Sequence, residues 1–185
     1  TAPRVVLASH NAKKLAELRS VLAHQIDGLD PAGVVSNADL ALSEPVEDGV
    51  TFEQNALIKA RSAARESGLM AIADDSGLSV DVLGGAPGIF SARWSGVHGD
   101  DSANNALLLA QLADIAPAHR GAAFVCAVAV VIPGSDGNGA IEFVERGVMR
   151  GRLLTEERGE GGFGYDPLFV PDGEQVTSCL LYTSD

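Results

Sequence analysis

Residues 4–24 read RVVLASHNAKKLAELRSVLAH, and this stretch indicates an α/β fold. The apolar run at 4–8 is typical of a strand, and polar residues then interrupt it. Leu15, Leu18 and Leu22 follow at the spacing of one face of a helix. A strand, a polar turn and a helix in this order direct the backbone N–H groups at the start of the helix towards an anion.

The same alternation of strands and helices continues along the chain. Thr51 and Gln54 have the spacing of a capping box, so a helix is predicted to begin there and to end near Ser67, before Gly68. A second helix is predicted over residues 100–115, and it carries leucines at helical spacing. Strands are expected at residues 34–35, 69–73, 78–83, 122–132, 140–149 and 168–171. This order predicts an α/β protein with mixed strand directions.

Composition limits the classes of protein to which the chain can belong. Its 185 residues suit one domain or two small lobes, and 46 % of them are hydrophobic, which suffices for a sizeable core. The formal net charge of −12 disfavours binding to nucleic acid or to an anionic membrane surface. The apolar run at 122–132 is far shorter than the roughly 20 residues of a membrane helix, and no signal-peptide pattern is visible. Cys126 and Cys179 form no disulfide framework, so the cytoplasm is the expected compartment.

The turn after the first strand is the first candidate site. Hydroxyl and amide side chains with lysines at a strand-to-helix turn suit a phosphate chain. No GxxxxGK pattern occurs, so the turn is not a Walker-type loop. The alternative is an N-cap followed by surface lysines. The candidate residues are Ser9, His10, Asn11, Ala12, Lys13 and Lys14.

Three acidic residues, Glu47, Asp74 and Asp75, form the second candidate site. Two adjacent carboxylates after an apolar run are costly unless they are solvated, paired or bound to a cation. Asp75, next to the expected loop, is predicted to reach the open end of the predicted strand, where oxygen ligands suit Mg²⁺. An Asx turn at a strand end is the alternative. Asn55 and Lys59 share one helix face, and Lys59 could pair with phosphate oxygens or be a solvated helix lysine.

A glycine-dense loop at residues 161–167 is the third candidate site. Phe163 and Tyr165 lie among glycines, which lets the backbone approach a ligand closely while a ring contacts a nucleobase. A surface turn is the alternative. Arg93 and the single tryptophan, Trp94, lie in another candidate segment, although a tryptophan is more often a core or interface residue.

Taken together, these segments closely resemble the inosine triphosphate pyrophosphatase family of house-cleaning nucleotide hydrolases. They occur in the family's order and extend to about Gly173. The resemblance implies an elongated mixed-sheet fold, with residues 1–185 as one domain of two lobes around a central cleft, and a homodimer. It also implies hydrolysis of noncanonical purine nucleoside triphosphates (ITP, dITP, XTP) to the monophosphate and pyrophosphate. The matching residues are Glu47 and the segments 7–14, 49–52, 55–56, 59–61, 72–78, 81–88 and 163–167.

The resemblance also implies roles for individual residues. Glu47 and Asp75 would hold Mg²⁺, and Asp75 would be the catalytic base with Asp74 supporting it. Lys59 would bind phosphate and Ser76 would contact the substrate. Ser9, Asn11 and Lys14 would bind the triphosphate, and Phe163, Gly164, Tyr165 and Asp166 would line the nucleoside pocket.

The chain departs from the family's pattern at residues 174–185, EQVTSCLLYTSD. At this point the family has a lysine and then a Ser-His-Arg motif that grips the 6-keto purine, and this segment has no lysine, histidine or arginine. A weaker preference for inosine over adenosine is therefore expected.

Two rival interpretations remain. One is a related pyrophosphatase that prefers other nucleotides, such as modified pyrimidines, and the other is a non-catalytic nucleotide-binding protein. Glu47 together with Asp75 favours catalysis.

Overall fold

The computed structural model describes residues 4–9, 12–25, 27–28, 30–134 and 139–181. The chain divides into two compact units. The first unit contains Thr1–Asp75 and Ala127–Arg146, and the second contains Ser76–Cys126 and Gly147–Asp185. Each unit therefore combines segments that are far apart in the sequence.

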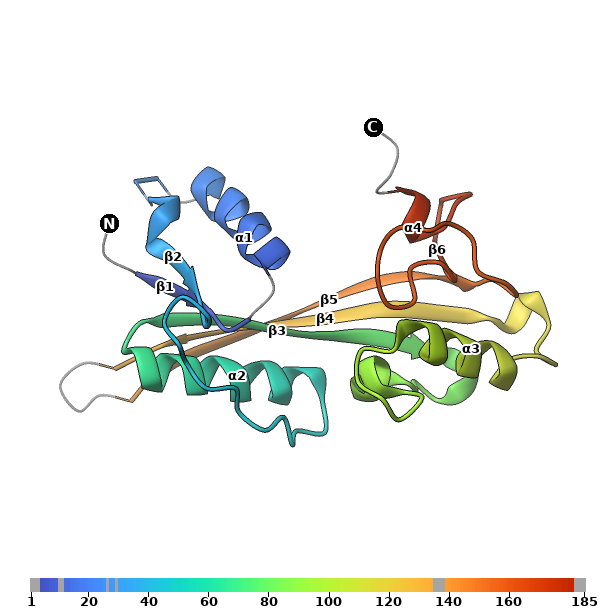
Figure 1. The fold of residues 1–185 in the computed structure, drawn as a ribbon, viewed down its shortest axis with the longest axis horizontal. Helices are drawn as coiled ribbons and strands as arrows, with labels where there is room; N and C mark the ends of the chain where they lie inside the picture. Colours follow the sequence, from blue (N-terminus) through green and yellow to red (C-terminus); the bar gives the residue numbers. More distant parts are fainter. Residues whose placement is uncertain (1–3, 10–11, 26, 29, 135–138, 182–185) are drawn as a thin grey trace. The chain divides into compact units, whose positions relative to one another are not determined.

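The strands form a six-stranded sheet in the order β2-β1-β3-β4-β5-β6 (Figure 1). β1 pairs in parallel with both β2 and β3, whereas β5 and β6 are antiparallel. The predicted α/β class with mixed strand directions is confirmed. The strands are β1 (Val5–Leu7), β2 (Val34–Ser36), β3 (Met70–Val80), β4 (Gly121–Ile132), β5 (Ile141–Leu153) and β6 (Phe169–Pro171).

In the first unit, two helices cover opposite faces of β1 and β3 (Figure 1). α1 (Ala12–Gln25) packs Leu15 against Val5, Leu7 and Val34. Because side chains alternate along a strand, Val6 faces the other side, where the α2 helix (Phe52–Ser67) runs. The inward face of α2 is built mostly from small residues, and this lets the helix lie close to the sheet. These alanines are Ala56, Ala60, Ala63 and Ala64, all nearly inaccessible to solvent.

The caps of α2 largely follow the sequence prediction. The Thr51 side chain accepts a hydrogen bond from Gln54 N, and Gly68 ends the helix in the left-handed conformation at φ 69°. The capping box differs in one detail. The Gln54 side chain accepts from Val50 N, one residue before the N-cap, at 2.8 Å. It therefore holds the segment that enters the helix as well as the helix itself.

In the second unit, a hydrophobic core joins α3 (Asp101–Gln111) to the strands. Leu108 and Leu112 pack with Leu78, Leu168 and other buried residues of this unit. Asp100 caps α3 by accepting from Ala103 N. A short C-terminal helix, α4 (Ser178–Leu181), contacts β6. Four 3₁₀ segments complete the described elements: η1 (Pro31–Gly33) of the first unit, and η2 (Asp81–Leu83), η3 (Gly88–Arg93) and η4 (Pro117–His119) of the second.

Several predicted boundaries are wrong, including the end of α3, which is Gln111 and not residue 115. The expected break between strands at residues 69–73 and 78–83 does not exist, because β3 runs unbroken from Met70 to Val80. Asp74 and Asp75 therefore lie within a strand and form no Asx turn at its end. The expected second strand also ends early, since Asp81–Leu83 is a 3₁₀ turn. In the described part of the chain, no helix has both the length and the apolar character of a membrane span.

Candidate functional site

Glu47 lies on an extended segment, residues 42–50, which we call the strap because it is fastened to α2 at both ends. At one end, Ser43 donates from its backbone N and its hydroxyl to the Glu66 carboxylate. At the other end, Gly49 N donates to Asn55 Oδ1 at 2.9 Å. The strap has no strand pairing or helical hydrogen bonds of its own, so these side-chain contacts with α2 set its path.

Lys59 connects the strap to β3. Its Nζ lies 3.1 Å from Glu47 Oε2 and 3.6 Å from Asp75 Oδ1. The Lys59 and Asp75 side chains are only 19 % and 17 % exposed, whereas Glu47 is 38 % exposed. One ammonium thus balances two carboxylates, of which one is largely buried. The structure thus brings Glu47, Lys59 and Asp75 together, and their predicted roles in one site stay predictions.

The surroundings of the Asp75 carboxyl shift its pKa upward. Burial is the largest influence and raises its pKa, and the charges of Glu47 and Asp74 act in the same direction. The Lys59 ammonium and a hydrogen bond from Asn55 oppose this rise. Among the described residues, Asp75 Oδ2 is buried and has no hydrogen-bond partner. Such an oxygen is costly unless a ligand satisfies it.

These residues fit a divalent cation. The unpartnered Asp75 oxygen and the Glu47 carboxylate are hard oxygen donors, and Mg²⁺ binds through one or two protein carboxylates plus substrate phosphates. The described residues contain no group of three or more His, Cys, Asp or Glu side chains that could hold a metal by themselves. The donor set therefore suits a cation that takes its remaining ligands from water or from a phosphate-bearing substrate.

The two adjacent acids face opposite sides of the sheet. Because side chains alternate along β3, Asp75 lies on the face of the buried Ala73, towards α2. Asp74 lies on the face of Ile72, which packs with the α1 cluster. The two carboxylates therefore do not form one bidentate cluster, and Asp74 acts on Asp75 through its charge.

The strand-to-helix turn of the first unit lies next to the acids. β1 and β3 are parallel with Leu7 opposite Ile72, so Ser9 follows β1 at the level at which Asp74 follows Ile72. The predicted order of strand, turn and helix is confirmed, since α1 begins at Ala12. His10 and Asn11 lie outside the described residues, and of Lys13 and Lys14 only the helical backbone is described. The predicted phosphate contacts of this turn stay predictions.

In the second unit, the glycine-dense turn is held in place by its neighbours. Gly164 N donates to Asp101 Oδ2 at 2.7 Å, and Asn105 donates to Gly164 O at 3.0 Å. Gly162 and Gly164 have φ angles of 78° and 59°, which favour glycine. The turn leaves the Phe163 ring 78 % exposed. Phe163 is thus an aromatic ring presented to solvent on a fixed turn.

Tyr165 and Asp166 point inward. The Tyr165 ring packs in the core of the second unit, and its hydroxyl donates to Ser91 O at 2.8 Å. Burial raises the pKa of this phenol far above its ordinary value. Asp166 accepts from Phe163 N at 3.1 Å, and burial raises the pKa of its carboxyl. These contacts give both side chains a structural role, and their predicted contact with a nucleoside stays a prediction.

The remaining sequence candidates are divided between surface and core. Ser76 is exposed on β3. Trp94 packs partly buried against the core of the second unit and donates to Gln111. Arg93 lies over the Phe90 ring at 5.3 Å. The interpretation of Trp94 as a core residue is therefore favoured over a ligand contact.

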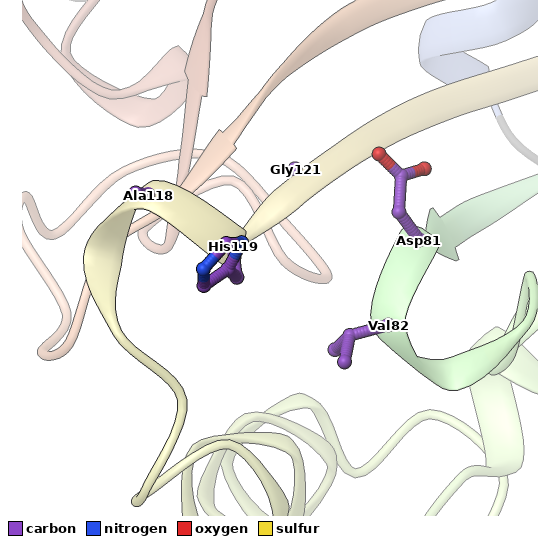
Figure 2. A pocket seen from close by; sticks show the side chains of 5 residues that line it. All are labelled: Asp81, Val82, Ala118, His119 and Gly121. Carbon is purple, nitrogen blue, oxygen red and sulfur yellow. The ribbon is translucent and has the colours of Figure 1, made fainter.

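The second unit also contains a pocket (Figure 2). Asp81 and Val82 from η2 line it on one side, and Ala118, His119 and Gly121 line it on the other. The Asp81 carboxylate already binds Arg150, at 2.6 and 3.0 Å. Because its acidic group is engaged, we assign this pocket no role in the chemistry.

Sequence reasoning gave no supporting role to four residues that hold these groups in place, three in the second unit and one in the first. Ser91 accepts from Leu78 N and donates to Gly88 O, and its carbonyl receives the Tyr165 hydroxyl. Asp101 and Asn105 hold the turn at Gly164. In the first unit, Gly49 donates to Asn55. The available signal for Gly49 was a glycine three residues before the start of α2, which indicates a close approach of backbone to another group.

The chain is similar to known proteins over nearly its whole length. A family model described as the Ham1 family matches residues 5–183. A curated dITP/XTP pyrophosphatase of Nocardia farcinica is 54 % identical over 187 aligned residues, which cover 98 % of this chain and 85 % of that protein. Another from Streptomyces avermitilis is 55 % identical over 178 residues, covering 96 % and 86 %.

Solved structures show the same fold. A crystal structure from Mycobacterium abscessus, described as a nucleoside-triphosphatase or dITP/XTP pyrophosphatase, is 50 % identical with a TM-score of 0.79. The match covers 95 % of this chain and 87 % of that one. A HAM1 protein from Coxiella burnetii is 36 % identical with a TM-score of 0.82, and the match covers 96 % and 86 %.

Proposed function

This chain belongs to the Ham1 family, and we propose that it hydrolyses noncanonical purine nucleoside triphosphates to the monophosphate and pyrophosphate with Mg²⁺. The observation that carries the chemistry is the buried oxygen of Asp75 that has no partner among the described residues, beside Lys59 and Glu47. An acidic chain binds a polyanion only where a metal and lysines reverse the local field.

Lys59 is the phosphate-binding cation of the site. Without substrate it contacts two carboxylates, and a bound phosphate chain offers it stronger, doubly charged oxygens. Ser9, Asn11 and Lys14 on the turn before α1 would hold the same chain, together with the helix N-terminus. Bound at Glu47 and Asp75, Mg²⁺ would neutralise charge on the phosphates and on the leaving pyrophosphate.

Asp75 is the general base in this proposal. A carboxylate whose pKa is raised by burial accepts a proton from water more readily than an exposed aspartate does. The oxygen of that water bonds to the α-phosphorus, while the bond from the α-phosphorus to the oxygen that bridges it to the β-phosphate breaks. The proton goes to Asp75 and the bridging oxygen leaves with pyrophosphate.

Phe163 is the side chain best placed to stack on a purine, because its ring is exposed on a fixed turn. Stacking alone accepts any purine. The resemblance further leads us to expect a homodimer that acts in the cytoplasm.

The test is a panel of ITP, XTP, dITP, GTP, ATP and a modified pyrimidine triphosphate, with and without Mg²⁺. Pyrophosphate and orthophosphate are quantified separately. We expect metal-dependent release of pyrophosphate from the inosine and xanthosine nucleotides. Orthophosphate as the first product would overturn the proposed bond cleavage. Faster turnover of the pyrimidine would favour a related pyrophosphatase, and binding without turnover would favour a non-catalytic binding protein.

A further inference from the structure

Asn55 contacts the strap at the end that carries Glu47. It lies on α2 one turn before Lys59, and it is 3 % exposed. Its Oδ1 accepts the hydrogen bond from Gly49 N at 2.9 Å, and Gly49 follows Glu47 by two residues. The position of the Glu47 backbone therefore depends on a side chain buried inside the first unit.

The contact is tight on the side of the strap. A Cβ atom at Gly49 would lie 2.5 Å from Asn55 Oδ1 and 2.8 Å from Gln54 Cβ. These distances are below those of real Cβ contacts, so a larger residue would push the strap away from α2. Gly49 is required here by close approach to α2.

Asn55 also acts on the second carboxylate. Its side chain opposes the rise in the pKa of Asp75 that burial causes. Because Oδ1 accepts from Gly49 N, the amide NH₂ is the part of Asn55 that can face a carboxylate. One side chain thus bonds the strap through its acceptor and keeps its donor group for Asp75.

We propose that Asn55 is a positioning residue that sets the separation of the Glu47 and Asp75 carboxylates, so that both can reach one divalent cation. This inference rests on the proposed function, because it assigns the two carboxylates to one metal. Residues that orient metal ligands from behind typically change metal affinity by about 10-fold to 100-fold when they are removed. We therefore expect an effect on metal binding that is separate from any effect on folding.

The experiment compares three variants with the unmodified chain. Asn55→Ala removes both contacts, and Gly49→Ala disturbs the strap contact while leaving Asn55 intact. Gln54→Ala is the matched control, because Gln54 is exposed and holds the adjacent strap residue, Val50, without contact to Asp75. Binding of Mn²⁺ alone is measured by the loss of its free electron paramagnetic resonance signal. Thermal unfolding verifies that each variant is folded.

Asn55→Ala and Gly49→Ala are expected to bind Mn²⁺ about tenfold more weakly, whereas Gln54→Ala binds as the unmodified chain does. In turnover, the half-activating Mg²⁺ concentration should rise by a similar factor, while KM at saturating Mg²⁺ stays within about twofold. Equal Mn²⁺ affinity in either folded variant, or no Mn²⁺ binding by the unmodified chain, would overturn the inference. If the unmodified chain binds Mn²⁺ but hydrolyses no triphosphate, the proposed function fails, and the Mn²⁺ comparison still decides the role of Asn55.

Discussion

The acidic site of the first unit and the glycine-dense turn of the second satisfy their polar groups differently. In the turn, Asp101 and Asn105 bond Gly164, and Ser91 O accepts from Tyr165. Asn105 Oδ1 has no partner among the described residues, but it belongs to a neutral amide, whereas the Asp75 oxygen without a partner among them belongs to a carboxylate. Burying an unpaired charge costs far more than burying a neutral polar group, so the acidic site is the one that favours a cation.

This difference separates residues that build a site from residues that act in it. A buried polar group with partners within the protein stabilises the fold, and its removal leaves those partners unsatisfied. A buried carboxylate without a full set of partners lowers stability, and it persists where function requires it. Tyr165 is an example of the first kind and Asp75 of the second. The two should therefore respond to substitution in opposite ways.

The largest effect is expected for Asp75→Asn. The amide is a poor metal ligand and cannot accept a proton at neutral pH, so kcat should fall by at least about 10²–10⁴-fold. Stability should not fall. Burial raises the pKa of Asp75 in the folded state, so the folded protein loses stability as the pH rises through that raised pKa, and the amide removes this loss.

Steady-state pyrophosphate release at pH 7 measures kcat, and thermal melting at pH 7 measures stability. Lys59 keeps Glu47 as a partner in this variant, at 3.1 Å, so no buried cation is left alone. A variant that keeps near-normal turnover would make Asp75 a structural residue, and the contrast between the two regions would disappear.

Tyr165→Phe should show the reverse pattern. It removes the hydroxyl that donates to Ser91 O and leaves that carbonyl without its partner. The free energy of unfolding should fall by about 1–3 kcal/mol, while kcat changes by less than about twofold. Urea unfolding and pyrophosphate release measure both. A large loss of turnover without loss of stability would place Tyr165 in the nucleoside pocket, as the sequence resemblance implies.

Phe163→Ala tests the one exposed group of the turn. The ring is 78 % exposed, so its loss should leave stability within about 0.5 kcal/mol of the unmodified chain. If Phe163 stacks on the base, KM for ITP should rise about tenfold, which corresponds to about 1.4 kcal/mol of stacking. KM for inorganic tripolyphosphate, which has no base, serves as the control and should not change if the enzyme accepts it.

Much of the fold could be predicted from local patterns. The leucine spacing of α1, the Thr51 cap and Gly68 stop of α2, and the apolar run of β4 all lie where the sequence indicated. The extent of β3 could not be predicted in this way. Asp74, Asp75, Ser76 and Gly77 have low strand propensity, and pairing with neighbouring strands overrides it.

The charged residues of the candidate site could be predicted from the sequence, whereas the residues that hold the candidate side chains in place could not. The i, i+4 spacing of Asn55 and Lys59 indicated one helix face, and the structure places Lys59 between Glu47 and Asp75. The inward direction of Tyr165 depends on Ser91, 74 residues away, and the turn depends on Asp101 and Asn105. Contacts between residues so far apart leave no local pattern in a single sequence.

The smallest effect is expected at an ion pair that is shorter than the Lys59–Asp75 pair but more exposed. Arg61 binds Glu142 with two contacts of 2.7 Å between α2 and β5, and both side chains are substantially exposed, at 50 % and 32 %. Exposed pairs stabilise by only about 0.2–1 kcal/mol. Glu142→Gln should therefore lower the free energy of unfolding by less than about 1 kcal/mol at pH 7 and leave kcat unchanged.

The dependence of this loss of stability on pH and salt tests whether the exposed ion pair with Arg61 is its cause. The Arg61 hydrogen bonds hold the pKa of Glu142 below its ordinary value of 4.5, so the stability that the pair contributes is present above that pH and is lost as the pH falls further. The difference between the variant and the unmodified chain, measured by urea unfolding, should shrink below pH 4.5 and also in about 1 M salt, which screens exposed charges. A loss above about 2 kcal/mol, insensitive to salt, would mean that distance rather than burial determines the strength of these ion pairs. Burial would then not be what distinguishes the Lys59–Asp75 pair from the exposed Arg61–Glu142 pair.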